Sequence, residues 1–156
     1  VAESAGAVVK RWEELKQHEK DGNKTVLSGV PASLPTLIKA YRIQDKARGV
    51  GFDWEQPEDV WMKVDEELGE LREAIASKSA DDAEGELGDF LFSVINVARK
   101  YDLNPDNALE RTNAKFIRRF GYIEAKAKEV GRSLRDMTLA EMDELWNEAK
   151  RLESQP

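Results

Sequence analysis

Two acidic clusters on consecutive predicted helices constrain this chain more than any other feature. The first cluster is Glu66-Glu67-x-x-Glu70, and the second is Glu86-x-x-Asp89. On a helix of about 3.6 residues per turn, residues three apart lie on one face. We expect the two helices to be adjacent and antiparallel, so their spacing turns several carboxylates toward one inter-helical space.

The helix that carries the second cluster is apolar around most of its circumference. One polar line interrupts the apolar surface, and such a line needs partners when the helix packs into a core. Carboxylates that meet without a cation repel one another, whereas a hard divalent cation takes oxygen ligands and removes the repulsion. The pattern therefore predicts a Mg²⁺ site. The polar line contains Glu86, Asp89, Ser93 and Asn96, and the apolar surface contains Leu87, Phe90, Leu91, Val94, Ile95, Val97 and Ala98.

A simpler interpretation is that both acidic clusters are solvated helix faces. The chain contains 31 Asp and Glu residues among 156, and acid pairs three residues apart arise often by chance in helices of this composition. The metal site is therefore a hypothesis that needs structural context.

Composition indicates a soluble globular chain. Its 156 residues suit one domain with a sizeable core, and 40% of them are hydrophobic and 35% charged. The net charge of −7 argues against binding to nucleic-acid polymers or to anionic membrane surfaces. No apolar run approaches the length of a membrane span. The absence of cysteine is compatible with a reducing cytoplasm, where we expect the protein to act.

Hydrophobic periodicity predicts helices along the chain, and no strand pattern of comparable length occurs. We therefore expect an all-α fold, an antiparallel helical bundle with short loops. Caps and breakers place the helix ends. The predicted helices run from about residue 7 to 20, from a cap at Ser33 to about residue 49, from Pro57 to about residue 77, from Asp81 to about residue 100, from Asn104-Pro105 to Gly131, and from the capping box Thr138-Leu-Ala-Glu141 onward.

The stretch from residue 21 to 31 is polar and rich in turn-forming residues, which makes it the best linker candidate. We therefore expect an N-terminal helix with a linker over residues 1–30 and a helical main domain over residues 31–156. Long apolar helices in a small chain often complete their core across a dimer interface, so we also expect a homodimer.

Several cations and one tryptophan lie at helical spacing near apolar stripes, and two interpretations remain open. In the structural one, they cover apolar surface or pair with acids one turn away, as Lys63 would with Glu67. In the functional one, the cations neutralise phosphate oxygens and the indole offers a flat face to a base. The residues are Lys63, Lys115, Arg119, Trp146 and Lys150.

Other chemistries lack their residues. Gly49-Val50-Gly51 does not have the spacing of a P-loop and follows no strand, so we interpret it as a helix C-terminal turn. His18 is the only histidine, and we expect it to be solvated on the first helix. Without further histidines or any cysteine, the chain has no candidates for a Glu-x-x-His di-iron site or for a Ser-His-Asp or Cys-His catalytic site.

In order and spacing, these motifs resemble the MazG family of all-α nucleoside triphosphate pyrophosphohydrolases. The resemblance rests on the two acidic clusters, the upstream Lys63, and residues 34–54, 113–120 and 142–150, and it covers about residues 31–152. It implies Mg²⁺-dependent hydrolysis of (deoxy)nucleoside triphosphates to monophosphate and pyrophosphate by a dimeric helical bundle. Residues 31–156 would then be the catalytic domain.

The resemblance also implies roles for individual residues. The fitting mechanism is metal-assisted attack of water on the triphosphate, with Glu66 as our candidate to orient or deprotonate the water. The implied metal ligands are Glu67, Glu70, Glu86 and Asp89, the implied phosphate-binding cations are Lys63, Lys115, Arg119 and Lys150, and Trp146 would lie near the nucleotide. Our own candidates for the catalytic carboxylates are Glu66, Glu67 and Glu70.

Members of this family often carry two such domains in tandem, whereas this chain has one set of motifs. Its first thirty residues resemble the segment that enters the second domain, so we expect the chain to be the C-terminal part of a longer protein. The alternative function is a non-catalytic helical module for dimerisation or nucleotide sensing.

Overall fold

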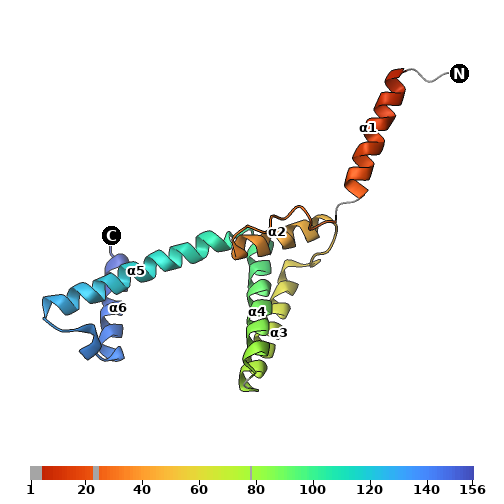
Figure 1. The fold of residues 1–156 in the computed structure, drawn as a ribbon. Helices are drawn as coiled ribbons and strands as arrows, with labels where there is room; N and C mark the ends of the chain where they lie inside the picture. Colours follow the sequence, from red (N-terminus) through yellow and green to blue (C-terminus); the bar gives the residue numbers. More distant parts are fainter. Residues whose placement is uncertain (1–4, 23–24, 78) are drawn as a thin grey trace. The chain divides into compact units, whose positions relative to one another are not determined.

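The computed structural model describes residues 5–22, 25–77 and 79–156, and within these ranges every regular element is a helix. The all-α prediction is confirmed. The helices are α1 (Ala5–Gly22), α2 (Thr36–Gly49), α3 (Val60–Ala76), α4 (Ala80–Lys100), α5 (Pro105–Glu129) and α6 (Leu139–Glu153), with the short 3-10 helices η1 (Pro57–Asp59) and η2 (Leu134–Asp136) (Figure 1).

The chain divides into two compact units at the start of α5, namely Val1–Pro105 and Asp106–Pro156. The placement of the units relative to one another is not determined. The predicted division into residues 1–30 and 31–156 concerns the linker before α2 and stays a prediction. None of the helices, as far as they are described, combines the length and apolar character needed to cross a bilayer.

Local sequence signals explain several helix ends. The hydroxyl of Thr138 accepts a hydrogen bond from the backbone N–H of Glu141 at 3.1 Å, which confirms the predicted N-cap of α6. Ser79 caps α4 in the same way, through the N–H of Asp82 at 3.4 Å. Gly131 follows α5 with a φ of +67°, a left-handed conformation that glycine adopts without steric cost.

The start of α2 differs from the prediction. Ser33 was expected to cap this helix, but α2 begins at Thr36 and its N-cap is Pro35, with φ −52° and ψ 139°. A proline disfavours the helical conformation in the residue before it, so the helix cannot begin ahead of Pro35. The fixed φ of the proline instead suits the position where the helix starts.

In the first unit, α3 and α4 form an antiparallel pair, and α2 packs against α4 (Figure 1). This arrangement confirms that the two acidic helices are antiparallel neighbours. Val60 at the start of α3 and Ile95 in α4 are buried in this unit. The pairing of α3 with α4 sets the geometry of the acidic clusters.

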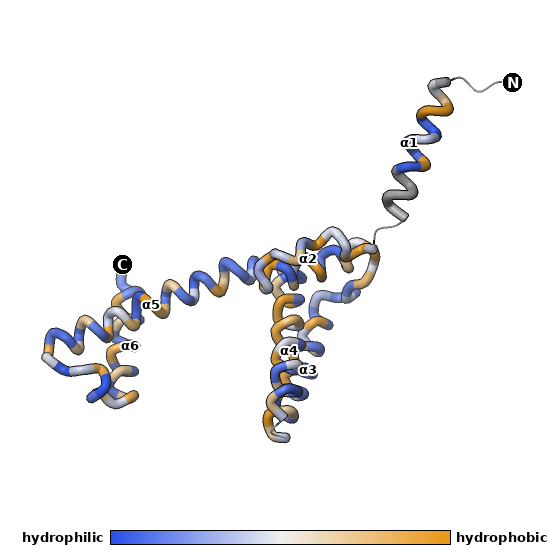
Figure 2. The backbone as a smooth tube through the Cα atoms, viewed as in Figure 1, coloured by the Kyte–Doolittle hydropathy of each residue, from blue (hydrophilic) through white to orange (hydrophobic). Residues whose placement is uncertain are grey.

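The polar line of α4 lies toward the neighbouring helices, whereas much of the apolar surface of the helix is left uncovered. Ser93 on the polar line is 3% exposed, but Leu91 is 50% exposed and Leu87 and Val94 are also exposed. Apolar residues recur along α4 in Figure 2. Within the first unit, as far as it is described, an apolar face of α4 therefore has no partner.

The predicted apolar side of α1 is also exposed, as Trp12 and Leu15 illustrate. His18 lies outside the residues whose side chains the structure describes.

In the second unit, side chains join α5 to α6. The ring of Phe116 stacks on that of Phe120, with centroids 5.9 Å apart, and lies 5.3 Å from the ring of Trp146 on α6. Ile123, Ala127 and Ala149 are buried in the same unit. An aromatic and aliphatic cluster thus holds this helix pair together.

Candidate functional site

Three of the predicted ligand carboxylates converge between α3 and α4. Glu67, Glu70 and Glu86 each offer an oxygen, and these oxygens all lie within 4.8 Å of one another. The three-residue spacing places Glu67 and Glu70 on one face of α3, and the antiparallel neighbour α4 brings Glu86 to that face. The geometry agrees with the predicted convergence, whereas the role of these residues as ligands stays a prediction.

Two oxygens of this cluster have no hydrogen-bond donor. Oε2 of Glu67 and Oε2 of Glu86 are both buried, and neither accepts a hydrogen bond from any residue that the structure describes. The Glu67 residue as a whole is only 6% exposed. A buried carboxylate oxygen without a partner is costly, and a hard cation that takes oxygen ligands would satisfy both atoms. The all-carboxylate donor set therefore fits Mg²⁺.

The electrostatics of the cluster also favour a bound cation. The negative charge of Glu67, followed by that of Glu86, raises the pKa of the Glu70 carboxyl above its ordinary value. The repulsion that raises the pKa of Glu70 favours the binding of a positive charge, which removes this repulsion.

Lys63 already pairs with this end of α3. Its Nζ lies 2.9 Å from Oε1 of Glu67 and 3.2 Å from Oε1 of Glu66. Hydrogen bonds to Glu67 and then to Glu66 raise the pKa of Lys63 above its usual range. The lysine thus satisfies one oxygen of Glu67 and leaves the other, Oε2, for a cation. The ion pair of the structural interpretation is present, and it does not conflict with a metal on the other oxygen.

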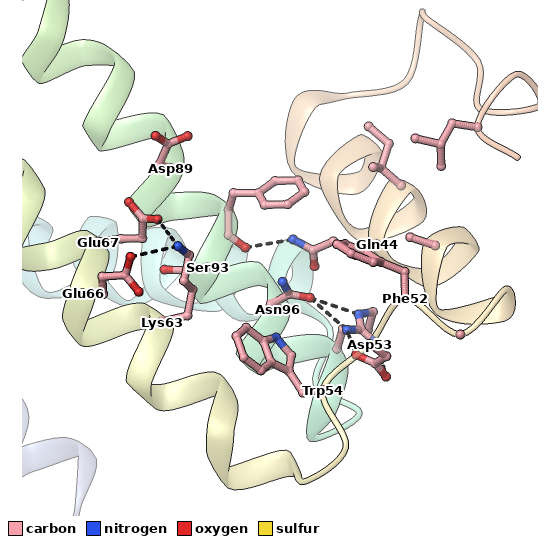
Figure 3. Close-up of a pocket in the computed structure, with 16 residues that line it drawn as sticks. Gln44, Phe52, Asp53, Trp54, Lys63, Glu66, Glu67, Asp89, Ser93 and Asn96 are labelled. Carbon is pink, nitrogen blue, oxygen red and sulfur yellow. Dashed lines mark hydrogen bonds and ion pairs between the residues drawn. The ribbon is translucent and has the colours of Figure 1, made fainter.

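Asp89, the fourth predicted ligand, lies one turn beyond Glu86 on α4. It lines the same cavity as Glu66 and Glu67 (Figure 3), but it is exposed and does not belong to the group of three converging carboxylates. Of the predicted acidic residues, the structure therefore brings three together and places Glu66 and Asp89 beside them.

A cavity of about 820 Å³ extends from the acidic residues toward α2 and the segment that follows it. Its volume lies within the range of about 300–1,000 Å³ that is typical of small-molecule sites. Its walls contain Leu27, Ile43, Gln44, Ala47, Gly51, Phe52, Asp53, Trp54, Lys63, Glu66, Glu67, Asp89, Phe92, Ser93, Asn96 and Arg99 (Figure 3).

A buried ion-pair network fixes one wall of this cavity. Arg99 donates to both oxygens of Asp53, at 3.2 and 2.6 Å, and Lys100 donates to Asp53 and to the backbone oxygen of Trp54, each at 3.0 Å. The hydrogen bond from Arg99 is the main reason why the pKa of Asp53 lies well below its usual range. The segment from Phe52 to Trp54 is thereby attached to the end of α4.

Sequence reasoning did not select Arg99 as a functional or structural residue, although a signal was present. Arg99 continues the polar line of α4, because it lies three residues after Asn96 and six after Ser93. A charged residue at the next position of a buried polar line predicts a buried partner.

Gln44 of α2 was also missed. It is 5% exposed, and its Nε2 donates to the backbone oxygen of Phe92 at 2.8 Å. The available signal was its position three residues after Tyr41 and seven after Leu37, which places a polar side chain on the apolar stripe of the helix.

The remaining predicted site residues belong to the second unit. Arg119 donates to Glu153 at 3.0 and 2.8 Å, and its guanidinium lies 5.3 Å from the centroid of the Trp146 ring. Lys115 and Lys150 form no ion pair with residues in the described part of the chain. The structure thus brings Arg119 and Trp146 together within this unit, and their position relative to the acidic cluster is not determined.

Comparison with known proteins agrees with this arrangement of acidic helices. Residues 55–122, which include α3, α4 and much of α5, match the MazG nucleotide pyrophosphohydrolase domain. The chain is 39% identical over 149 residues to the nucleoside triphosphate pyrophosphohydrolase/pyrophosphatase MazG of Thermotoga maritima. It is 34% identical over 158 residues to the nucleoside triphosphate pyrophosphohydrolase of Escherichia coli (strain K12), and 47% identical over 148 residues to the uncharacterized protein YabN of Bacillus subtilis.

These similarities cover 95%, 97% and 94% of this chain, respectively. The chain spans 57% of the Thermotoga protein, 59% of the Escherichia protein and 30% of YabN. The match to the domain includes both acidic clusters, and the similarity to relatives extends over nearly the whole chain. The chain therefore contains a MazG nucleotide pyrophosphohydrolase domain.

Proposed function

We propose that this chain hydrolyses (deoxy)nucleoside triphosphates to nucleoside monophosphate and pyrophosphate, and that it requires Mg²⁺. The observation that carries the proposal is the pair of buried, unpartnered oxygens on Glu67 and Glu86, which converge with Glu70. The printed names of the Thermotoga and Escherichia relatives support the same reaction.

In this proposal the carboxylates have separate tasks. Glu67, Glu70 and Glu86 hold the metal, and Asp89 completes the ligand set from the next turn of α4. When bound, Mg²⁺ supplies a water of lowered pKa and neutralises phosphate charge. Glu66 orients the attacking water and accepts its proton on the carboxylate, for which its exposed position at the edge of the cavity is suitable. Attack by water cleaves the bridge between the α- and β-phosphorus and releases pyrophosphate.

The cations bind the triphosphate in this proposal. Lys63 is held beside the cluster by its two glutamates. Lys115, Arg119 and Lys150 contribute from the second unit, and Trp146 lies near the nucleotide. Arg119 would exchange its ion pair with Glu153 for a phosphate oxygen, which is a change between two charge-assisted hydrogen bonds.

We further propose that the protein is a homodimer in which the apolar face of α4 lies at the interface. This face is defined by Leu87, Leu91 and Val94, which recur at helical spacing and are exposed in the described chain. Contiguous exposed apolar surface marks interaction sites in proteins, and a second copy of the chain offers a matching apolar face.

Product analysis tests the proposed reaction. The purified chain is incubated with each NTP and dNTP in the presence of Mg²⁺, and the products are identified by ³¹P NMR. Monophosphate with pyrophosphate is the expected result. Diphosphate with phosphate would contradict the proposal, and binding without turnover would favour the nucleotide-sensing alternative.

A further inference from the structure

The cavity has a second polar feature, away from the acidic cluster. Gln44 and Phe52 lie on the side away from the acidic residues (Figure 3), and the aromatic and aliphatic side chains of the cavity lining include Ile43, Ala47, Phe52, Trp54 and Phe92. Walls of this kind suit a flat, largely apolar ring, whereas the acidic end suits a metal and phosphates. A nucleoside triphosphate has this division between its base and its phosphates.

Gln44 lines this end of the cavity with a buried oxygen that has no donor. Its amide orientation follows from the hydrogen bond in which Nε2 donates to the backbone oxygen of Phe92, at 2.8 Å. Only Nε2 can donate to that carbonyl, so Oε1 is the remaining atom, and it is buried without a partner among the described residues. A buried acceptor without a donor is costly, and a ligand that brings an N–H would satisfy it.

Ser93 also lines the cavity, where it lies toward Lys63 and Glu67 (Figure 3). It is almost completely buried, and its hydroxyl donates to the backbone oxygen of Phe90 at 2.6 Å. Because the only hydroxyl hydrogen is used in that bond, Ser93 presents lone pairs to the cavity. The buried oxygen of Gln44 therefore favours a ligand group that brings an N–H over one that brings an oxygen.

We propose that this end of the cavity is the base subsite and that Gln44 selects a base whose exocyclic amino group lies at C6 of a purine or C4 of a pyrimidine, as in adenine and cytosine. The inference rests on the proposed function, since the phosphates of the same nucleotide would lie at the acidic end. The amino groups of adenine at C6 and cytosine at C4 offer two N–H donors. The keto groups that guanine, uracil and thymine carry at the corresponding positions would place lone pairs against the Gln44 oxygen.

The test removes the amino group from the ligand and the acceptor from the protein. Two ligand pairs are compared by kcat/KM: ATP with purine riboside triphosphate, and CTP with the triphosphate of pyrimidin-2-one riboside. For at least one pair, we expect the wild type to prefer the amino-bearing nucleotide by roughly tenfold or more. Gln44→Met, which keeps the side-chain length but has no amide, is expected to reduce that preference to about twofold or less. The nucleotide pair whose kcat/KM ratio changes in Gln44→Met shows whether the preferred base is a purine or a pyrimidine.

A ratio between two ligands separates recognition from folding. A variant that only destabilises the protein lowers kcat/KM for both members of a pair and leaves the ratio unchanged. Gln44→Glu keeps an acceptor oxygen and is expected to retain the preference. Arg42→Met places the same new side chain at an exposed position of α2, outside the cavity lining, and is the matched control with an unchanged ratio.

A binding measurement makes the inference independent of turnover. The affinities of AMP, CMP and the monophosphates of the two analogues are measured by NMR titration without metal, for the wild type and for Gln44→Met. If the triphosphates are not hydrolysed but Gln44 still discriminates between the monophosphates, the proposed function fails and the base subsite stands. If hydrolysis occurs but neither pair is discriminated, or Gln44→Met discriminates as the wild type does, the base subsite is wrong.

Discussion

At the scale of single residues, the acidic cluster is a site of mutual repulsion that a cation would relieve. Glu70 has a raised pKa because Glu67 and Glu86 lie beside it. Removing its charge should therefore weaken metal binding and, in the absence of metal, relieve strain in the cluster. These opposite effects on activity and on stability distinguish a metal site from a solvated acidic face.

We predict that Glu70→Gln and Asp89→Asn each lower turnover by about a hundredfold or more, because each removes a charged ligand without a change in size. In EDTA, the melting temperature of Glu70→Gln should equal or exceed that of the wild type. Steady-state kinetics and thermal melts measure both quantities. Glu73→Gln, an exposed position of α3 outside the cluster, is the control. Near-wild-type turnover of Glu70→Gln at saturating Mg²⁺ would show that the metal assignment is wrong.

Arg118 and Arg119 allow the functional and structural interpretations of a cation to be compared directly. Both pair with Glu153 at 2.8 Å, but only Arg119 is a predicted phosphate ligand. We predict that Arg119→Ala weakens binding of a non-hydrolysable dNTP with Mg²⁺ by about 1.5–3 kcal/mol, as does Lys115→Ala, whereas Arg118→Ala leaves the affinity unchanged. Calorimetric titration gives the affinities. A lowered melting temperature with unchanged affinity for Arg119→Ala would mean that this cation is structural.

At the scale of helices and segments, buried pairs fix the walls of the cavity. Arg99 of α4 is almost fully buried, and the carboxylate that neutralises it comes from the segment between α2 and α3. If Asp53 is neutralised, the guanidinium remains buried without its counter-charge.

We predict that Asp53→Asn lowers the free energy of unfolding by about 3 kcal/mol, the cost of leaving a buried charge unpaired. Asp45→Asn breaks an exposed pair with Arg48 and should cost less than about 1 kcal/mol. Urea denaturation of both variants gives the comparison. Equal effects of the two substitutions would show that the Asp53 network contributes no more than an exposed ion pair.

The pairing of α5 with α6 should depend on pH through Glu153. Hydrogen bonds from Arg119 and Arg118 lower the pKa of this carboxyl from 4.5 to about 2. A depressed folded-state pKa contributes stability that is present above the unfolded value and is lost as the pH falls from about 4.5 toward 2. We predict that the melting temperature of the wild type falls across this window more than that of Glu153→Gln. Parallel curves for the two proteins would contradict the assigned role of Glu153.

Much at this scale could be predicted from the sequence, because helix periodicity and capping are local. The Thr138 cap and the antiparallel acidic helices are examples. Ser33 was a wrong cap because the effect of Pro35 on the preceding residue outweighed the capping preference. Gln44 and Arg99 were missed because their partners, Phe92 and Asp53, are more than forty residues away in the chain. Local patterns can indicate that such a residue needs a partner, but they do not identify the partner.

At the scale of the whole molecule, the apolar face of α4 would be exposed to solvent in a monomer and covered in a dimer. We predict that the protein sediments as a dimer at micromolar concentration and that Leu91→Glu, in the middle of this face, shifts it toward monomer, because a charge would be desolvated in the interface. Val130→Glu changes an exposed apolar residue outside α4 and should leave the dimer intact. A monomeric wild type under these conditions would contradict the proposed assembly.

In the proposed function, the acidic cluster catalyses the reaction. One assay tests both the products of the reaction and the role of the cluster. ³¹P NMR follows the products from ATP and CTP with Mg²⁺ or with EDTA, for the wild type and for Glu86→Gln, which alters one of the two buried, unpartnered carboxylates of the acidic cluster. We predict monophosphate and pyrophosphate from the wild type with Mg²⁺, and a rate lower by about a hundredfold or more for Glu86→Gln. Hydrolysis in EDTA, wild-type turnover by Glu86→Gln, or release of phosphate with diphosphate would contradict a metal-dependent pyrophosphohydrolase at this site.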